Sequence, residues 1–256
     1  MQRHLLTIAT LLLPAAAVAQ PLSISVENLA DTDGFFLTPV WFGLHDGSFD
    51  LFDPGSAATL GLEELAEDGL LDNLQAEFAA PGRVQGVVAN ADGFGGAPII
   101  DPGETATTLL PTMNPAAYQY FSFASMVIPS NDAFIGNGNP LAYQVFNAGG
   151  DFIGPITIDV FGSNIWDAGT EVNDTLGAAF STIGGMSSDE NGVVALHLGL
   201  ADFEGTGTPA GSVALGAAPS SADLVARITI TQIPEPTGLG LLSLAGLGLA
   251  GAGRRG

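Results

Sequence analysis

Three carboxylates stand directly after apolar, strand-like stretches of the chain. Asp132 lies in the segment 122–136, and Asp167 and Glu171 lie in the segment 165–171. Loops that follow neighbouring strands can meet at one edge of a sheet, so the three side chains can converge there. Ca²⁺ takes several oxygen ligands, and acidic side chains from adjacent loops supply them. The spacing therefore predicts a site for Ca²⁺ or another divalent cation, while the residue types alone fit solvated loops equally well.

The sequence around these carboxylates is more distinctive than the carboxylates themselves. Pro-Ser-Asn-Asp occupies 129–132 and Trp-Asp-Ala-Gly-Thr occupies 166–170, with further characteristic motifs at 23–29, 39–47 and 65–69. Together they resemble the spondin N-terminal domain, which occurs in the extracellular-matrix F-spondins and mindin and in many exported bacterial proteins. The resemblance extends over about residues 22–230. It implies a non-enzymatic extracellular module.

The resemblance also implies a ligand set. In the family, an aspartate of the first motif and two acidic positions of the second hold a divalent metal, usually taken as calcium. By position these ligands are Asp132, Asp167 and Glu171, with Asn131 and the carbonyl of Trp166 as further candidate oxygens. Animal domains have aspartate where Glu171 stands, and the extra methylene changes the reach of that carboxylate. The chain has no cysteine, so disulfide bracing, thiolate catalysis and zinc–thiolate sites are excluded.

The two ends of the chain read as export signals. Arg3, the apolar run 5–13 and the small residues Ala17 and Ala19 form a secretory signal peptide, which predicts cleavage by signal peptidase after Ala19. At the other end, an uncharged Gly- and Leu-rich stretch from Thr237 to Gly253 stands between two short motifs, Pro234, Glu235 and Pro236 before it and Arg254 and Arg255 after it.

That C-terminal arrangement resembles the PEP-CTERM sorting signal of Gram-negative bacteria, which an exosortase processes. A 17-residue helix rises about 26 Å, close to the hydrocarbon thickness of a bilayer, so the stretch fits a transient transmembrane helix. The two arginines favour the cytoplasmic side. A permanent C-terminal anchor is the alternative. The expected organisation is a signal peptide at 1–19, a domain at 20–232 and a sorting signal at 233–256.

Charge limits the partners. The chain carries 27 acidic and 5 basic residues, a formal net charge of −22, and no lysine. Such a field repels phosphate backbones and excludes nucleic-acid binding. Acidic polysaccharides and anionic membranes are repelled as well, unless divalent cations bridge them. Most of these carboxylates are expected to confer solubility, or to reflect a saline habitat.

The hydropathy pattern is typical of β structure. Apolar and polar residues alternate along 22–26, 118–128, 193–198 and 224–231, and clusters of Gly, Asn, Asp and Pro separate these runs. The pattern predicts a mostly β fold, an antiparallel β-sandwich with a short helical excursion after the first strands. For the first helix we expect Ser56 as N-cap, Leu62, Leu65 and Ala66 on one face and Gly69 as the stop. Leu71, Leu74 and Phe78 continue in a second short helix.

Other polar motifs favour structural roles. The segment 31–34 (Asp-Thr-Asp-Gly) is interpreted as a solvated turn and 189–192 (Asp-Glu-Asn-Gly) as a hairpin turn. His45 is expected near the metal end in a hydrogen-bonding role, and His197 on a strand face. No Gly-x-Ser-x-Gly or His-Glu-x-x-His motif accompanies either histidine. Trp41 and Trp166 are expected to pack in the core or at its rim, with a role as platforms for sugar rings as the less favoured alternative.

The sequence therefore predicts an exported, surface- or matrix-associated, non-enzymatic protein with a calcium-binding spondin domain, active in adhesion or in a biofilm matrix. Its partners would be signal peptidase and exosortase during export, and then an extracellular polysaccharide or a surface protein. Two alternatives remain open. One is an enzyme acting on envelope polysaccharide, which needs two carboxylates across a sugar-sized cleft. The other is a structural spacer in which the metal only braces loops.

Overall fold

The first and last strands of the domain form the centre of a four-stranded sheet. Buried and half-buried residues alternate along β1 (Leu22–Asn28), as expected for a strand with one face in the core. β1 pairs antiparallel with β13 (Leu224–Gln232), from Leu22 opposite Gln232 to Asn28 opposite Ala226. β5 (Thr105–Leu110) and β8 (Ile156–Phe161) complete the order β5-β1-β13-β8. The strand expectations for the two ends of the domain are confirmed.

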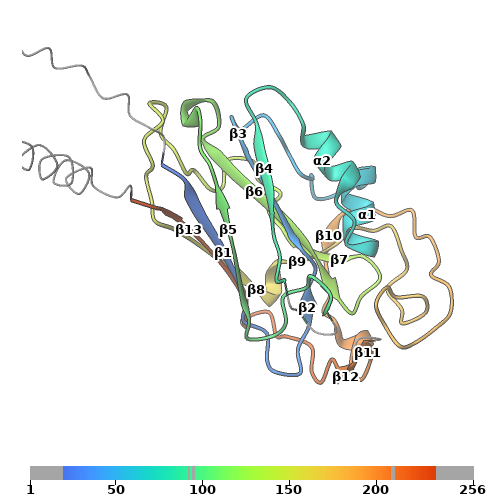
Figure 1. Cartoon of the computed structure of the whole chain (residues 1–256). Coiled ribbons are helices and arrows are strands. Elements are labelled where there is room, and N and C mark those ends of the chain that lie inside the picture. Colours follow the sequence, from blue (N-terminus) through green and yellow to red (C-terminus); the bar gives the residue numbers. More distant parts are fainter. Residues whose placement is uncertain (1–19, 92, 94–95, 209–210, 235–256) are drawn as a thin grey trace, which may run out of the picture.

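A larger antiparallel sheet lies across from the first. Its order is β10-β9-β7-β6-β3-β4, and the short β2 pairs with β6. Its longest strand, β6, runs the length of the molecule (Figure 1) and pairs with β3 on one side and β7 on the other. The strands are β2 (Phe36–Leu37), β3 (Val40–His45), β4 (Val84–Val88), β6 (Tyr120–Ile128), β7 (Ala133–Gly136), β9 (Ile165–Asp167) and β10 (Ala195–Leu196).

The computed structural model describes residues 20–91, 93, 96–208 and 211–234. Most processing residues expected from the sequence, Ala17, Ala19, Glu235, Pro236, Arg254 and Arg255, lie outside these ranges, and only Pro234 lies within them. Over the described ranges, no helix is long and apolar enough to cross a membrane. The stretch 237–253, which we expected to do so, lies outside them.

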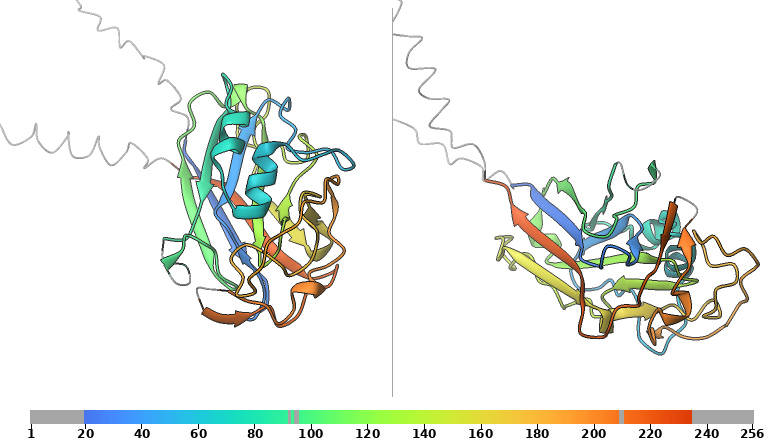
Figure 2. Two further views of the ribbon diagram at one scale, coloured as in Figure 1. Left: turned by 90° about the vertical axis from the view of Figure 1, so that its right-hand side faces the viewer. Right: turned by 90° about the horizontal axis from the view of Figure 1, so that it is seen from below.

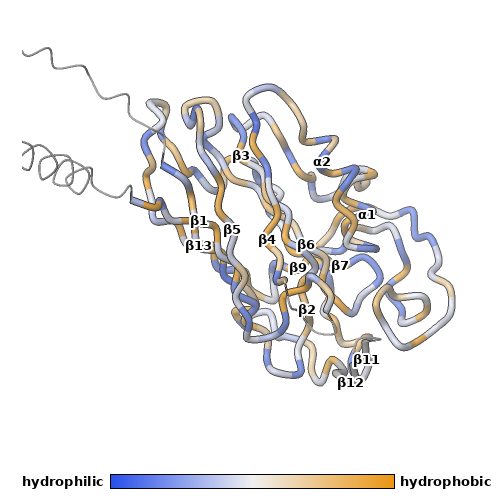
Figure 3. The backbone as a smooth tube through the Cα atoms, viewed as in Figure 1, coloured by the Kyte–Doolittle hydropathy of each residue, from blue (hydrophilic) through white to orange (hydrophobic). Residues whose placement is uncertain are grey.

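Two apolar layers hold the sandwich together. The main core lies between the sheets and includes Ile24, Phe42, Phe123, Ile228 and Ile230. A second cluster lies on the outer face of the large sheet, where Trp41 and Phe134 pack against buried residues of the two helices, Phe78 among them. Figure 2 shows the helices lying over this face, and Figure 3 shows hydrophobic residues recurring along β4, β5 and β6. The predicted β-sandwich with a helical excursion is confirmed.

The helical excursion begins three residues later than the sequence suggested. α1 spans Leu60–Asp68, and Thr59, not Ser56, is its N-cap; the Thr59 hydroxyl accepts a hydrogen bond from the Leu62 backbone nitrogen at 3.3 Å. Gly69 ends the helix in the left-handed conformation, as expected. Leu62, Leu65 and Ala66 are buried, and so are Leu74 and Phe78 of α2 (Asp72–Phe78).

The strand expected over 193–198 is shorter than predicted. Only Ala195–Leu196 pair, with Trp166 and Asp167 of β9, because β9 itself has three residues. The remaining elements are single turns or short ribbons: η2 (Pro115–Ala117), η3 (Gly162–Asn164), η4 (Ala201–Phe203), β11 (Gly207–Thr208) and β12 (Gly211–Ala214).

Candidate metal centre

The turn between β6 and β7 holds the first predicted ligand. Ser130 closes this turn: its hydroxyl donates to the carbonyl of Val127 at 2.6 Å and accepts from the backbone nitrogen of Ala133 at 3.1 Å. The next two residues, Asn131 and Asp132, are both fully buried. A polar pair at this depth needs partners on all sides.

One oxygen of Asp132 fastens a second segment to the turn. Its Oδ2 accepts hydrogen bonds from the backbone nitrogens of Thr170 at 2.8 Å and Glu171 at 3.1 Å, and lies 3.2 Å from the Thr170 hydroxyl. β7 and β9 pair so that Ala133 faces Asp167. Asp132 therefore ties together the two segments that carry the predicted ligands.

Asp167 and Glu171 approach the same turn from the loop after β9. Asp167 Oδ1 accepts from the Gly169 nitrogen at 2.6 Å, and its Oδ2 accepts a hydrogen bond from the Asn173 side chain. Glu171 Oε2 lies 3.5 Å from the amide nitrogen of Asn131. The three carboxylates thus gather around one turn.

His197 supports Asp167 through Asn173. The His197 Nδ1 accepts from the Gly199 nitrogen at 3.1 Å, so its Nε2 carries the proton and donates to Asn173 Oδ1 at 2.9 Å. Burial lowers the pKa of His197 from its usual value. The neutral imidazole therefore fixes the orientation of the amide that binds Asp167.

Two buried oxygens at the turn have no hydrogen-bond partner. They are Oδ1 of Asn131 and Oδ1 of Asp132, and no other buried side-chain nitrogen or oxygen of the described chain is left in this state. A buried polar atom without a partner is costly and calls for a specific explanation such as a bound ion or water. Both atoms are oxygens, which is the donor type that Ca²⁺ takes.

The electrostatic field at the turn is strongly negative. Burial, and then the charge of Asp167, raise the pKa of Asp132 to about 6. The pKa of Glu67 on α1 is raised to about 7, first by burial and then by Glu171, Glu63 and Asp132, against a hydrogen bond with Thr170. Carboxylates that resist ionisation in this way are stabilised by a cation.

The carboxylates do not form a closed shell by themselves. Across the ranges that the structure describes, no three side chains of His, Cys, Asp or Glu are close enough together to share an ion. A cation at this turn would therefore need the amide oxygen of Asn131 and water or backbone oxygens in addition to carboxylates. Those ligand types are common in calcium sites.

A model of the Spondin_N family matches residues 37–183. The chain belongs to the spondin N-terminal family. No match was found among the sequences of curated proteins. Family membership indicates an extracellular, matrix-type protein, and members of the family are generally non-enzymatic. All three predicted ligands lie inside the matched range, whereas β1 and β13 lie outside it, so the sandwich extends beyond the match at both ends.

Four further residues contribute to the site in ways that the sequence signals only in part: Glu67, Asn131, Thr170 and Asn173. Asn131 was named as a further candidate oxygen, and Thr170 and Glu67 belong to the spondin-like motifs at 166–170 and 65–69. Their roles depend on segments brought together by the fold. Asn173 carries no sequence signal that separates it from any other loop asparagine.

His45 of the spondin domain lies far from this turn. β3 pairs antiparallel with β6, so His45 faces Tyr120 at the start of β6, whereas Asp132 follows Ile128 at its end. The expectation that His45 lies near the metal end is therefore wrong. Its hydrogen-bonding role is confirmed, because Nε2 contacts the Ser122 hydroxyl at 3.0 Å and Nδ1 accepts from the Gly47 nitrogen at 3.0 Å.

The two acidic turns have different outcomes. In the segment 31–34, the Gly34 nitrogen donates to the Asp31 carbonyl at 2.6 Å, which confirms a turn. The segment 189–192 is not a hairpin turn. Its backbone pairs with the loop after β9: Glu190 donates to the Thr170 carbonyl and Gly192 to the Gly169 carbonyl, at 2.8 and 2.7 Å. It thereby covers the predicted ligand loop.

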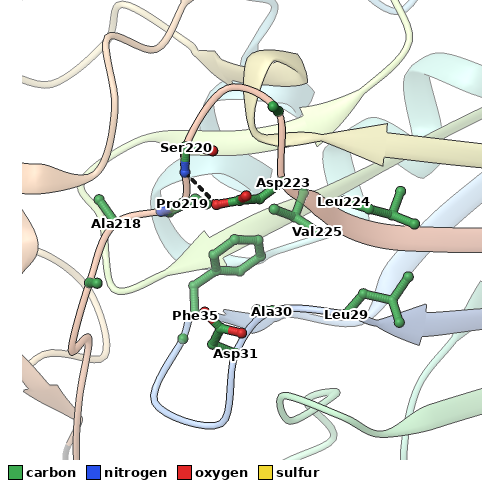
Figure 4. A pocket seen from close by; sticks show the side chains of 13 residues that line it. Leu29, Ala30, Asp31, Phe35, Ala218, Pro219, Ser220, Asp223, Leu224 and Val225 are labelled. Carbon is green, nitrogen blue, oxygen red and sulfur yellow. Dashed lines mark hydrogen bonds between the residues drawn. The ribbon is translucent and has the colours of Figure 1, made fainter.

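Two acidic hollows in the described part of the chain bear on the alternative of a polysaccharide-cleaving enzyme. The hollow beside Glu67 is lined by Glu63, Glu67 and Asp189 among small residues, with no aromatic side chain. Figure 4 shows another hollow, of about 500 Å³, with Asp31 and Asp223 in its wall. There Asp223 accepts from the Ser220 nitrogen at 2.7 Å and so closes a turn.

Proposed function

We propose that this spondin domain binds Ca²⁺ at the turn between β6 and β7 and acts outside the cell as a non-enzymatic adhesion or matrix component. Asp132, Asp167 and Glu171 would hold the ion, together with the amide oxygen of Asn131. Binding would have to draw the three carboxylates closer together than they lie in the described structure. The observation that carries the proposal is the pair of buried oxygens without a partner, Asn131 Oδ1 and Asp132 Oδ1.

The charge at the turn supports the same proposal. Burial, and then the charges of neighbouring carboxylates, raise the pKa values of Asp132 and Glu67, so ionising these groups without a counter-charge is unfavourable there. A bound cation would neutralise this repulsion and could offer a remaining coordination position to a carboxylate or hydroxyl of a partner. The chain's own residues hold the loops in place: Oδ2 of Asp132 already fastens the segment 170–171.

Thermal unfolding tests the ion site. The full-length chain is melted in chelator and across a calcium titration, beside Asp167→Asn. A ligand at 100 times its dissociation constant adds about 2.7 kcal/mol, which is seen as a raised midpoint. We expect a saturable shift in the wild type that the variant loses. Equal melts with and without calcium in the wild type would remove the ion site from the proposal.

A binding assay tests the adhesive role separately. Extracellular polysaccharide from a bacterial matrix is coated on a surface, and retention of the wild type is compared with that of Asp167→Asn. Calcium-dependent retention that the variant loses, with its fold unchanged by circular dichroism, supports adhesion through the ion. A saturable calcium shift without any retention would favour the structural-spacer alternative.

We also propose that the chain is exported and then sorted through its C-terminal signal. The basis is the sequence pattern at the two ends, with Ala17 and Ala19 at one and Pro234, Glu235 and Pro236 at the other. Mass spectrometry of the protein isolated from cell surface and medium would locate its mature ends. Cleavage after Ala19 and close to Pro234 is expected, and an intact C-terminus in the surface fraction would favour a permanent anchor.

A further inference from the structure

A cleft at the open edge between the two sheets is separate from the proposed ion site. It has a volume of about 360 Å³ and lies between the loop after β7, the strand β8 and the start of β9. This volume is at the small end of the range for ligand pockets, roughly 300–1,000 Å³. Its wall includes Trp166, Tyr143, Asn139, Asn164 and Asp159.

The two aromatic residues of the cleft are firmly supported from behind. The ring of Trp166 packs against Phe52 with centroids 4.9 Å apart, and that of Tyr143 against Phe123 with centroids 6.2 Å apart. Both residues are half-buried, so each leaves part of its surface open. Flat aromatic faces held in place in this way give contact area with little loss of conformational entropy on binding.

The cleft residues also carry hydrogen-bonding groups that the protein does not use. The side-chain oxygens of Asn139 and Asn164 accept from the nitrogens of Leu141 and Phe161, at 3.0 and 3.1 Å, which fixes both amides. No described residue accepts from their amide nitrogens, from Trp166 Nε1 or from the Tyr143 hydroxyl. Pre-oriented donors of this kind suit a ligand rich in hydroxyl oxygens.

The charge of the cleft is balanced, in contrast to the rest of the molecule. Its one carboxylate, Asp159, accepts from Arg227 Nε at 2.7 Å. Arg227 is one of five basic residues in a chain with 27 acidic ones. A cationic ligand would find more negative surface elsewhere, and an anionic one would be repelled by the protein as a whole.

We propose that this cleft binds a neutral hexopyranose, as a free sugar or as one unit of a neutral polysaccharide. The C–H groups of a sugar ring carry slight positive charge and pack on the negative face of an aromatic ring. Its hydroxyl oxygens accept from the amides of Asn139 and Asn164. Trp166 precedes Asp167 on β9, and successive strand residues point to opposite faces. The side chain of Trp166 therefore faces away from the proposed ion ligand Asp167, and we expect binding in the cleft to be independent of the ion.

Tryptophan fluorescence offers a direct readout on the full-length chain. The protein has two tryptophans, and Trp41 is fully buried with its Nε1 donating to Gln85 at 2.8 Å. Changes in emission and in acrylamide quenching therefore report on Trp166. The probes are glucose, galactose, N-acetylglucosamine and cellotetraose, with glucuronate as the charged analogue, each titrated in calcium and in chelator.

We expect saturable binding of at least one neutral probe, equal with and without calcium, and binding of glucuronate weaker by fivefold or more. Saturation-transfer NMR on the sugar then compares variants. Asn164→Ala and Tyr143→Phe each remove one hydrogen bond and should weaken binding three- to tenfold. Asn114→Ala, an exposed asparagine at another hollow, is the matched control and should change nothing.

Three outcomes would overturn the proposal. The first is that no neutral probe binds saturably. The second is that the wild type and both folded cleft variants bind with equal affinity. The third is that binding is lost in chelator, which would place the sugar at the ion site. If Asn164→Ala melts abnormally, Asn139→Ala takes its place. Failure of the calcium titration leaves this test unaffected, because the two sites are probed by different ligands.

Discussion

Two buried polar clusters stand at opposite ends of β6, and they differ in how completely they are satisfied. At the start of the strand, His45 donates through Nε2 to Ser122, Asn137 Nδ2 contacts the same hydroxyl at 3.3 Å, and Asn137 Oδ1 accepts from the Phe123 nitrogen at 2.9 Å. At the end of the strand, Asn131 and Asp132 each leave one buried oxygen without a partner.

The difference in hydrogen bonding between the two clusters suggests different roles for them. A satisfied network needs nothing from outside and fixes the conformation of its surroundings. The His45 ring is further enclosed by Phe49, Phe78 and Tyr120. An incompletely satisfied cluster of oxygens, by contrast, is stabilised only by something that binds it. The comparison fits a structural role at one end of β6 and supports the ion-binding role that we propose at the other.

The largest effect is expected from Asp132→Ala. This substitution leaves the nitrogens of Thr170 and Glu171 and the Thr170 hydroxyl without their acceptor and should lower the free energy of unfolding by about 3 kcal/mol or more. Asp132→Asn keeps an acceptor at that position and should cost less than about 1 kcal/mol in chelator. Urea denaturation measures both. Equal losses in the two variants would show that Oδ2 does not organise the loop.

Acid should destabilise the His45 cluster. Burial, with help from the charge of Arg83, lowers the pKa of His45 to about 4. The folded state therefore favours the neutral ring, and its stabilisation is complete above pH 6.5 and is lost as the pH falls towards 4. The loss is on the order of 3 kcal/mol. His45→Gln should flatten this part of the profile measured by urea denaturation; an unchanged slope would contradict the assignment.

The carboxylate cluster should respond to pH in the opposite direction. Because the pKa values of Asp132 and Glu67 are raised to about 6 and about 7, the folded state holds protons that the unfolded state releases. In chelator, the contribution of this cluster to stability should be greatest near pH 4 and fall as the pH rises through 7. The loss is on the order of 3 kcal/mol from the buried Asp132, with a smaller addition from Glu67 because that side chain is partly exposed.

This second profile is measured in the His45→Gln background, where the opposing titration is absent. Calcium should remove the loss of stability at pH 7 to 8, because the ion replaces the protons. Asp132→Asn should flatten the profile. A profile that keeps its slope in Asp132→Asn and in Glu67→Gln would assign the titration to other groups.

The smallest effect on stability is expected from Asn173→Ala. It removes the amide between Asp167 and His197 and should cost about 1 kcal/mol. Outer partners of metal ligands often alter affinity more than stability, so calcium binding, followed by isothermal titration, should weaken by about tenfold. Asn114→Ala is a suitable control, and an unaltered affinity in Asn173→Ala would remove this residue from the site.

The fold was predictable where a local pattern determines the outcome. Alternation along β1 and β13 reflects one face in the core, and Gly69 ends α1 because it adopts the left-handed conformation easily. Serine is by type a slightly better N-cap than threonine, so the start of α1 at Thr59 depends on how the helix packs against β6 and β7. The shortness of β10 depends on its partner strand β9, and the sequence pattern of β10 itself holds no information about that partner.

The candidate site was predictable only in its ligand types. The positions of Asp132, Asp167 and Glu171 follow from the spondin-like motifs. The burial of Asp132, however, depends on its hydrogen bonds with the backbone nitrogens of Thr170 and Glu171, which come 38 and 39 positions later in the chain. The segment 189–192 has turn-forming residues and nevertheless pairs with the ligand loop, because unpaired backbone groups there find partners across it.

The pairing of the first and last strands has a mechanical consequence. The Ile233 nitrogen donates to the Pro21 carbonyl at 2.9 Å, so the chain enters and leaves the domain at the same corner, at the far end of the sandwich from the turn that holds Asp132 (Figure 1). If the protein is tethered through its C-terminus and loaded at that turn, the force runs along β13. This strand is held on both sides, by β1 and β8. The hydrogen bonds of both ladders would then share the load in shear, whereas pulling the two ends apart would open the β1–β13 ladder one bond at a time.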